Sequence, residues 1–83
     1  MTKNPINDST LVSLGKRIRE ARKSLHWSQE DLAYRAELDR SYIGGIERGE
    51  RNISFISLTR IARALGKDIS FLTKGIPNAQ INR

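Results

Sequence analysis

The side chains best suited to chemistry in this sequence gather near residues 28 and 40, and they are suited to binding rather than to catalysis. Arg40 and Ser41 stand together at the start of a helix predicted over about residues 40–48. The planar guanidinium of an arginine can span O6 and N7 of guanine, and a serine hydroxyl can bond a base or a phosphate. Gln29 follows Ser28 at the first position of another predicted helix, where free backbone amides attract phosphate. We therefore expect this part of the chain to contact nucleic acid.

The residue types that enzymes and metal sites need are almost absent. No paired carboxylates, nucleophile–histidine set or phosphate-cradling glycine loop accompanies the single His26. Without cysteine the chain forms no disulfide or thiolate metal site, and one histidine cannot hold zinc by itself. His26 is better interpreted as a surface residue and Trp27 as the edge of a core. We predict that the protein is not an enzyme and needs no cofactor or metal.

The charge balance favours a polyanionic partner. The chain of 83 residues carries 15 lysines and arginines against 9 acids, which gives a net charge of +6. Ribosomal and membrane-surface proteins are also basic, so charge alone does not decide the partner. The N-terminus lacks the apolar stretch of a signal peptide, and no run approaches the roughly 20 apolar residues that span a bilayer. We therefore expect one cytoplasmic domain with no membrane partner.

Apolar periodicity and capping residues predict an all-α domain without strands. The helices are expected from Thr10 to near Leu25, for about two turns after Ser28, from Arg40 to about Arg48, from Ser54 to Gly66 and from Asp68 to near Gly75. The polar segments 1–9 and 77–83 have no helical period and are expected to be a flexible arm and tail. The folded domain is therefore predicted over residues 10–76.

The stretch SQEDLAYRAELDRSYIGGIERGERNIS, residues 28–54, resembles the XRE-type helix-turn-helix family, which includes the lambda-type and 434-type phage repressors. The specific part is Ser-Gln-Glu-x-Leu-Ala followed by Tyr-Ile-x-x-Ile-Glu-Arg-Gly, and the order of the helices extends the likeness over about residues 11–72. Residues 39–43, with Arg51 and Asn52, look in particular like the controller proteins of restriction-modification systems. The resemblance implies a compact five-helix lambda-repressor-like domain. It also implies a transcriptional regulator, repressor or activator, that binds a double-stranded DNA operator as a homodimer.

Three residues depart from the family pattern. Glu37 stands where the family usually has the glycine of the turn, so a conventional turn requires a left-handed Glu37 at a cost of about 1 kcal/mol. Gly44 and Gly45 stand where most relatives carry side chains that reach bases, and each glycine within a helix costs roughly 0.5–1 kcal/mol relative to alanine. They can let the helix approach the groove wall or leave room for a thymine methyl. The alternative is close packing between protein helices.

A helical wheel over residues 40–48 separates a packed face, with Ile43 and Ile46, from a free face. In helix-turn-helix docking the start of the recognition helix meets base edges. Base contacts are therefore expected from Arg40, Ser41, Gly44 and Gly45. Phosphate or groove-edge contacts are expected from Gln29, Arg35, Tyr42, Arg48, Arg51 and Asn52. The alternatives are a solvated charge or phosphate contact for Arg40 and solvated charges for Arg35 and Arg48.

The resemblance also implies an ion pair and a dimer interface. The family places an arginine and a glutamate at the positions of Arg22 and Glu47, as a partly buried pair between the first and third helices. One recognition helix contacts too few base pairs for good specificity, so two half-sites are expected. Phe71 points away from the inward side of the last helix and would otherwise be exposed. The expected dimer interface therefore comprises Ile69, Phe71, Leu72 and Ile76.

A protein-interaction module on the same fold, for example an antitoxin that binds a toxin, is the alternative function. Such a module has no need for a basic arc with Gln29, Arg40, Arg48 and Arg51 on one surface. The arrangement of these four side chains in space therefore discriminates between the two functions. Contacts with a toxin or with RNA polymerase are not predicted by any motif in the sequence.

Overall fold

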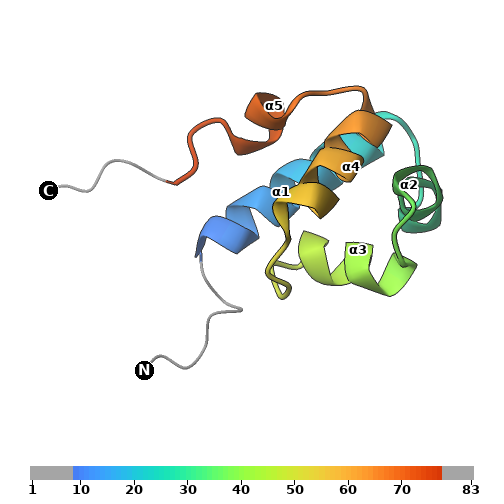
Figure 1. Cartoon of the computed structure of the whole chain (residues 1–83), viewed down its shortest axis with the longest axis horizontal. Helices are drawn as coiled ribbons and strands as arrows, with labels where there is room; N and C mark the ends of the chain where they lie inside the picture. Colours follow the sequence, from blue (N-terminus) through green and yellow to red (C-terminus); the bar gives the residue numbers. More distant parts are fainter. Residues whose placement is uncertain (1–8, 78–83) are drawn as a thin grey trace, which may run out of the picture.

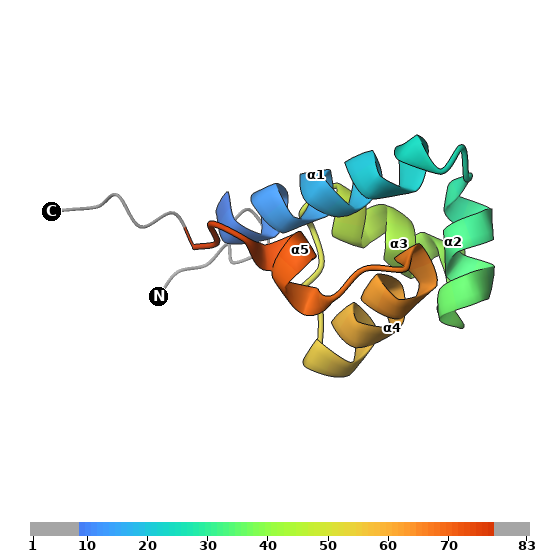
Figure 2. The same ribbon diagram turned by 90° about the horizontal axis from the view of Figure 1, so that it is seen from above.

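Five α-helices make up the described part of the chain, residues 9–77, in the computed structural model (Figures 1 and 2). They are α1 Ser9–Ser24, α2 Gln29–Ala36, α3 Arg40–Glu47, α4 Phe55–Leu65 and α5 Ile69–Thr73. No strand occurs within these residues, and the predicted all-helical class is confirmed. The proposed arm lies outside the described residues except for Ser9, which already begins α1, and the proposed tail lies outside them except for Pro77.

The helix starts follow from short-range hydrogen bonding. The Ser28 hydroxyl accepts from the backbone N–H of Asp31 at 3.0 Å, and the Asp31 carboxylate accepts from the backbone N–H of Ser28 at 2.8 Å. The Ser28 backbone bond lowers the pKa of Asp31, so this cap stabilises the fold at neutral pH and is lost as the pH falls through the lowered value. The side chains of Ser54 and Asp68 cap α4 and α5 by accepting from the backbone N–H of Ser57 and Phe71, whereas Asp39 stands at the start of α3 without a side-chain cap.

The turn between α2 and α3 has the conformation that the sequence predicts. Glu37 is left-handed, with φ 60° and ψ 45°, and its N–H donates to the carbonyl oxygens of Ala33 and Tyr34. His26 is also left-handed, with φ 62°, in the connection between α1 and α2. Because α1 ends at Ser24 and the chain turns there, Leu25 is 40% exposed and does not extend the inward stripe that was predicted to reach it.

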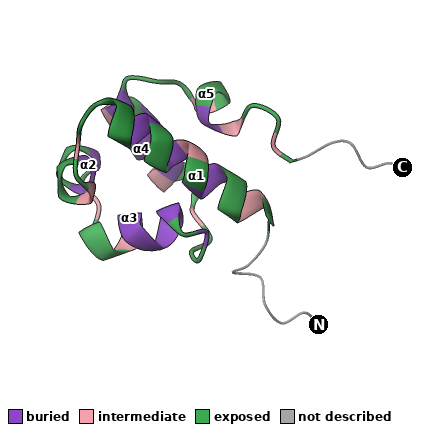
Figure 3. Ribbon diagram, turned by 180° about the vertical axis from the view of Figure 1, so that it is seen from behind, coloured by how far each residue is buried: buried purple, intermediate pink, exposed green. Residues whose placement is uncertain are grey.

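The core lies where the five helices meet, and α3 is buried along much of its length (Figure 3). The largest fully buried side chains of the core, one from each helix, are Ile18, Leu32, Ile43, Ile61 and Leu72.

Arg17 of α1 holds the short α5 in place by donating to the carbonyl oxygens of Phe71, Leu72 and Lys74 at 2.9–3.3 Å. α3 packs against α1 and against α2, and these two contacts fix its position in the domain. No helix in residues 9–77 has the length and apolar character needed to cross a membrane.

Candidate nucleic-acid interface

The starts of α2 and α3 meet at two of the predicted binding residues. Arg40 Nη1 donates to Gln29 Oε1 at 3.0 Å, and Gln29 Nε2 donates to Glu47 Oε1 at 3.0 Å. Arg40 is exposed and Gln29 is half-buried. The two side chains line a depression beside Ser28 and Glu30. The structure therefore joins Arg40, through Gln29, to the interior of the domain.

A buried ion pair lies behind these side chains. Arg22 Nε donates to Glu47 Oε2 at 2.7 Å and Arg22 Nη2 donates to Glu47 Oε1 at 2.9 Å, while each residue is only 8% exposed. Arg22 Nη1 also donates to the carbonyl oxygen of Trp27 at 2.8 Å. The hydrogen bonds that Arg22 donates to the Glu47 carboxylate raise the pKa of Arg22 above its ordinary value. The pair implied by the family resemblance is thus present, and it compensates an acid that would otherwise repel phosphate.

The two glycines of α3 lie on the predicted face, but they are not open to solvent. Gly44 and Gly45 are both buried, and side chains from outside the helix cover them. A Cβ at Gly44 would lie 3.2 Å from Arg48 Nη1 and 3.4 Å from Gln29 Oε1, and a Cβ at Gly45 would lie 2.5 Å from Arg51 Cγ. In the unbound chain the side chains of Gln29, Arg48 and Arg51 therefore cover these glycines, which a helical wheel does not show, and contact of the glycines with bases stays a prediction.

Arg51 and Tyr42 form the opposite end of the same surface. The Arg51 guanidinium lies over the Tyr42 ring, 5.0 Å from its centroid. Both line a depression with Ser41 and Asp39 at the turn between α2 and α3. Ser41 is exposed beside them, and Asn52 is exposed in the loop that follows α3. Ser41, Tyr42 and Arg51 therefore line one hollow beside α3, and Gln29 and Arg40 line another.

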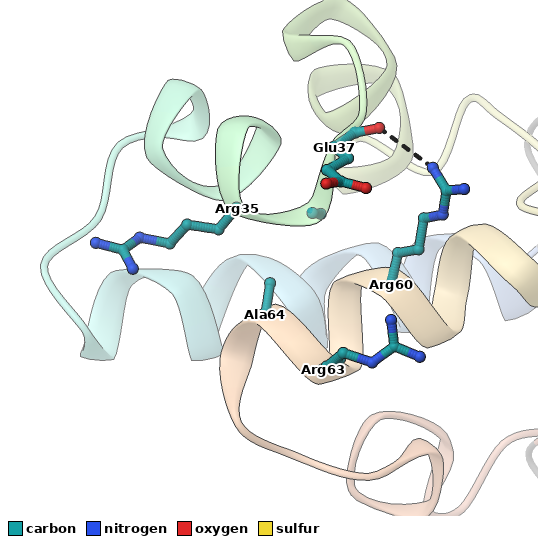
Figure 4. Close-up of a pocket in the computed structure, with 6 residues that line it drawn as sticks. Arg35, Glu37, Arg60, Arg63 and Ala64 are labelled. Atoms are coloured by element: carbon teal, nitrogen blue, oxygen red, sulfur yellow. Dashed lines mark hydrogen bonds between the residues drawn. The ribbon is translucent and has the colours of Figure 1, made fainter.

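Of the remaining two predicted arginines, Arg48 lies beside Gln29 over Gly44, whereas Arg35 lies apart from the other predicted side chains. Arg48 forms an exposed ion pair with Glu50 at 2.9 Å. The Arg35 guanidinium lies 4.4 Å from the centroid of the Trp27 ring, and Figure 4 shows it pointing away from Arg60 on α4. Arg35 lines a separate hollow of about 430 Å³ between α2 and α4. The structure therefore does not bring Arg35 together with Gln29, Arg40 and Arg51.

The residues predicted to form the dimer interface differ in how far they are exposed. Leu72 has no exposed surface and belongs to the core of its own chain, so its assignment to an interface is wrong. Ile69 and Ile76 pack partly against that core, while Phe71 stays 42% exposed. Two residues outside the predicted interface, at the start of α4, are more exposed. They are Phe55 at 67% and Ile56 at 63%.

The fold and this polar surface define a helix-turn-helix protein. The helix-turn-helix family model matches residues 18–72, and the chain belongs to this family of transcriptional regulators, of the XRE type. It is 45% identical over 53 residues to the control protein C.BamHI of Bacillus amyloliquefaciens, covering 63% of this chain and 65% of that protein, which is just under two thirds.

Solved structures show the same relationship. The restriction-modification controller protein C.AhdI of Aeromonas hydrophila has a TM-score of 0.76 at 45% identity, covering 77% of this chain and 97% of that one. The controller protein C.Esp1396I, solved as a tetramer in complex with its natural 35 base-pair operator, has a TM-score of 0.70 at 41% identity, covering 75% and 83%. The predicted resemblance to controller proteins is therefore confirmed.

Proposed function

We propose that this protein is a sequence-specific transcriptional regulator of the controller type, which binds operator DNA as a dimer with α3 in the major groove. The observation that carries the proposal is the position of Arg40, exposed in the first turn of α3 and hydrogen-bonded to Gln29 at the start of α2. This is the part of a helix-turn-helix that meets base edges. The operator complex of C.Esp1396I supports the assignment, and a cytoplasmic location is consistent with it.

The side chains of the surface divide the work between reading bases and holding the DNA backbone. Arg40 and Ser41 read base edges, because they stand at the exposed start of α3. Gln29 Nε2 has one hydrogen committed to Glu47, and the other is free to donate to a phosphate together with the first amides of α2. Arg51 approaches the groove edge or a phosphate from the loop. The contact between Arg40 and Gln29, together with Arg51 beside α3 at Gly45, favours this function over a pure protein-interaction module.

Selection of bound sequences from random duplex DNA tests the proposal. We expect enrichment of a sequence with two symmetric half-sites whose centres are about one helical turn, roughly 34–36 Å, apart or a multiple of it. The symmetry would follow from a two-fold dimer. Failure to enrich any sequence, with the protein folded by circular dichroism, would contradict the proposed function.

Arg40→Ala and Gln29→Ala are expected to weaken DNA binding in different ways. A bidentate arginine–guanine contact discriminates by about 1–3 kcal/mol, roughly 5-fold to 150-fold, so Arg40→Ala should relax the preference for guanine at one position of each half-site. Gln29→Ala should weaken binding to all sequences by a similar factor, because a phosphate contact does not read sequence. Affinities for the selected operator and its single-base variants, at several salt concentrations, measure both effects.

Arg19→Ala is the matched control, since it removes the same charge from an exposed position on α1 outside the candidate surface. It should leave the base preference unchanged. An equal loss of affinity for every operator variant in Arg40→Ala would make Arg40 a phosphate contact and would transfer base reading to Ser41, Tyr42 or DNA shape.

The dimer is expected to depend on the exposed apolar side chains of α4 and α5. Ile56→Glu should raise the dimer dissociation constant at least about tenfold, equivalent to about 1.4 kcal/mol, because it places a charge within an apolar contact. Ile56 is 63% exposed, so the fold should tolerate the change. Sedimentation at micromolar concentrations measures the shift. Tyr34→Glu, at an 86% exposed position on α2, is the control that should stay dimeric. A wild-type chain that is monomeric both free and on operator DNA would exclude the dimer.

A further inference from the structure

The aliphatic part of the Arg51 side chain packs directly against α3 at Gly45. A Cβ at Gly45 would lie 2.5 Å from Arg51 Cγ, 3.3 Å from Cδ and 3.8 Å from Cβ. Real Cβ atoms essentially never approach another heavy atom within 3.0 Å. Any other residue at this position would therefore displace the aliphatic part of Arg51 from the helix. Glycine is also a poor helix former, so its presence in the middle of α3 calls for a compensating role.

The backbone after α3 returns Arg51 to the helix by a defined path. Gly49 is left-handed, with φ 76°, and the N–H of Glu50 donates to the carbonyl oxygen of Gly45 at 2.9 Å. The chain therefore turns back at the end of α3, and Arg51 lies across the helix at Gly45. Tyr42, on the preceding turn of α3, places its ring 5.0 Å from the Arg51 guanidinium.

The Arg51 guanidinium lies over the Tyr42 ring, and this contact does not use its N–H donors. Those donors can form hydrogen bonds to phosphate or guanine in the plane of the group. Within residues 9–77 no carboxylate pairs with Arg51, and no hydrogen bond occupies its N–H donors. A side chain that is already ordered loses less conformational freedom when it binds. The arrangement therefore preserves donors for a ligand while it restricts the rotamers of the arginine.

We propose that Gly45 and Tyr42 form a seat that positions Arg51 for contact with DNA. Gly45 is then a positioning residue that acts through Arg51, and the backbone of α3 does not itself touch the groove at this point. The inference rests on the proposed function, because it takes DNA as the ligand of this surface. Gly44 differs from Gly45 because its neighbours are the ends of two flexible side chains, Arg48 and Gln29, at 3.2 and 3.4 Å, which can move aside.

A double-mutant cycle on operator binding tests the seat. We expect Arg51→Ala to weaken binding about 5-fold to 30-fold and to reduce the salt dependence by about one unit per subunit if it contacts a phosphate. Gly45→Ala should reproduce most of that loss, and the double variant should bind no more weakly than Arg51→Ala. If α3 instead approached DNA at Gly45, the added methyl would weaken binding by the same factor with or without Arg51, and this result would overturn the proposal. The parallel cycle with Gly44→Ala should show no coupling to Arg51.

A measurement without DNA separates the seat from the proposed function. In the free protein the ring current of Tyr42 should shift the side-chain protons of Arg51 in the NMR spectrum, and Gly45→Ala should abolish the shift. Tyr42→Leu should abolish it without changing the helix backbone, and Tyr42→Phe should keep it because the ring remains. Tyr42→Leu therefore tests the seat even if Gly45→Ala fails to fold. Unshifted Arg51 protons in the wild type would overturn the seat, whereas absent operator binding with shifted protons would overturn only the proposed function.

Discussion

Replacing Glu47 with alanine is expected to destabilise the fold by about 3–5 kcal/mol, because it leaves Arg22 charged and without its partner in a buried position. Both side chains are almost fully enclosed, with 9% of Arg22 and 2% of Glu47 accessible. Most of this cost reflects desolvated charge rather than the attraction within the pair. For a domain whose total stability is about 5–15 kcal/mol, the loss would leave a large unfolded fraction.

Denaturant unfolding of two further variants identifies the cause. Glu50→Ala breaks the exposed Arg48–Glu50 pair, whose N–O distance of 2.9 Å is similar, and it should cost only about 0–1 kcal/mol. The double variant Arg22→Met with Glu47→Leu should recover much of the lost stability, because it removes both charges and keeps apolar volume. A cost below about 1 kcal/mol for Glu47→Ala would show that the pair is solvated and does not tie α1 to α3.

The ion pair also matters for the DNA-binding surface. Glu47 Oε1 accepts from both Arg22 and Gln29, so one carboxylate oxygen fixes the side-chain amide that in turn accepts from Arg40. A glutamine amide has two nearly equivalent orientations, and a donor–acceptor chain of this kind selects one of them. Loss of Glu47 is therefore expected to loosen Gln29 and Arg40 as well as the packing of α1 on α3.

The features that the sequence predicts best depend on neighbouring residues along the chain. Ser28 and Asp31 cap α2 as predicted, since a capping box involves positions three residues apart. Left-handed Glu37 is implied by the family resemblance, because Glu37 stands where the family usually has the glycine of the turn. The order and bounds of the helices are predictable because caps and glycine stops are local signals.

Exposure within the site could not be predicted in this way. Gly44 and Gly45 lie on the correct side of α3, yet Gln29, Arg48 and Arg51 cover them from positions that a helical wheel does not include. The apolar pattern of α5 places Leu72 on the inward side of that helix, and its complete burial leaves it no surface for the dimer interface in which it was also placed. Phe55 belongs to the apolar positions of α4 in the sequence, yet it is 67% exposed, because exposure there depends on what packs against the first turn of the helix.

Gly15 is the residue whose replacement by alanine should most directly separate α1 from α3. A Cβ at Gly15 would collide with the backbone carbonyl oxygen of Ile46, and it would lie 2.7 Å from the carbonyl oxygen of Glu47 and 2.9 Å from its carbonyl carbon. Backbone atoms of a packed helix cannot move aside as a side chain can, so the two helices must shift apart. Overpacking of this kind costs typically 1–3 kcal/mol and occasionally more, and we expect at least about 3 kcal/mol here.

Helix propensity alone would change the stability in the opposite direction. In an isolated helix Gly15→Ala would be stabilising by about 0.8–1 kcal/mol, so a net loss measures the contact between α1 and α3 directly. In a domain of this size, 3 kcal/mol corresponds to a fall in Tm of roughly 12–24 °C. Ser13→Ala, at an exposed position on the same helix, is the matched control and should change Tm by only a few degrees. A Gly15→Ala variant as stable as the wild type would mean that α1 does not pack against the backbone of α3 at this glycine.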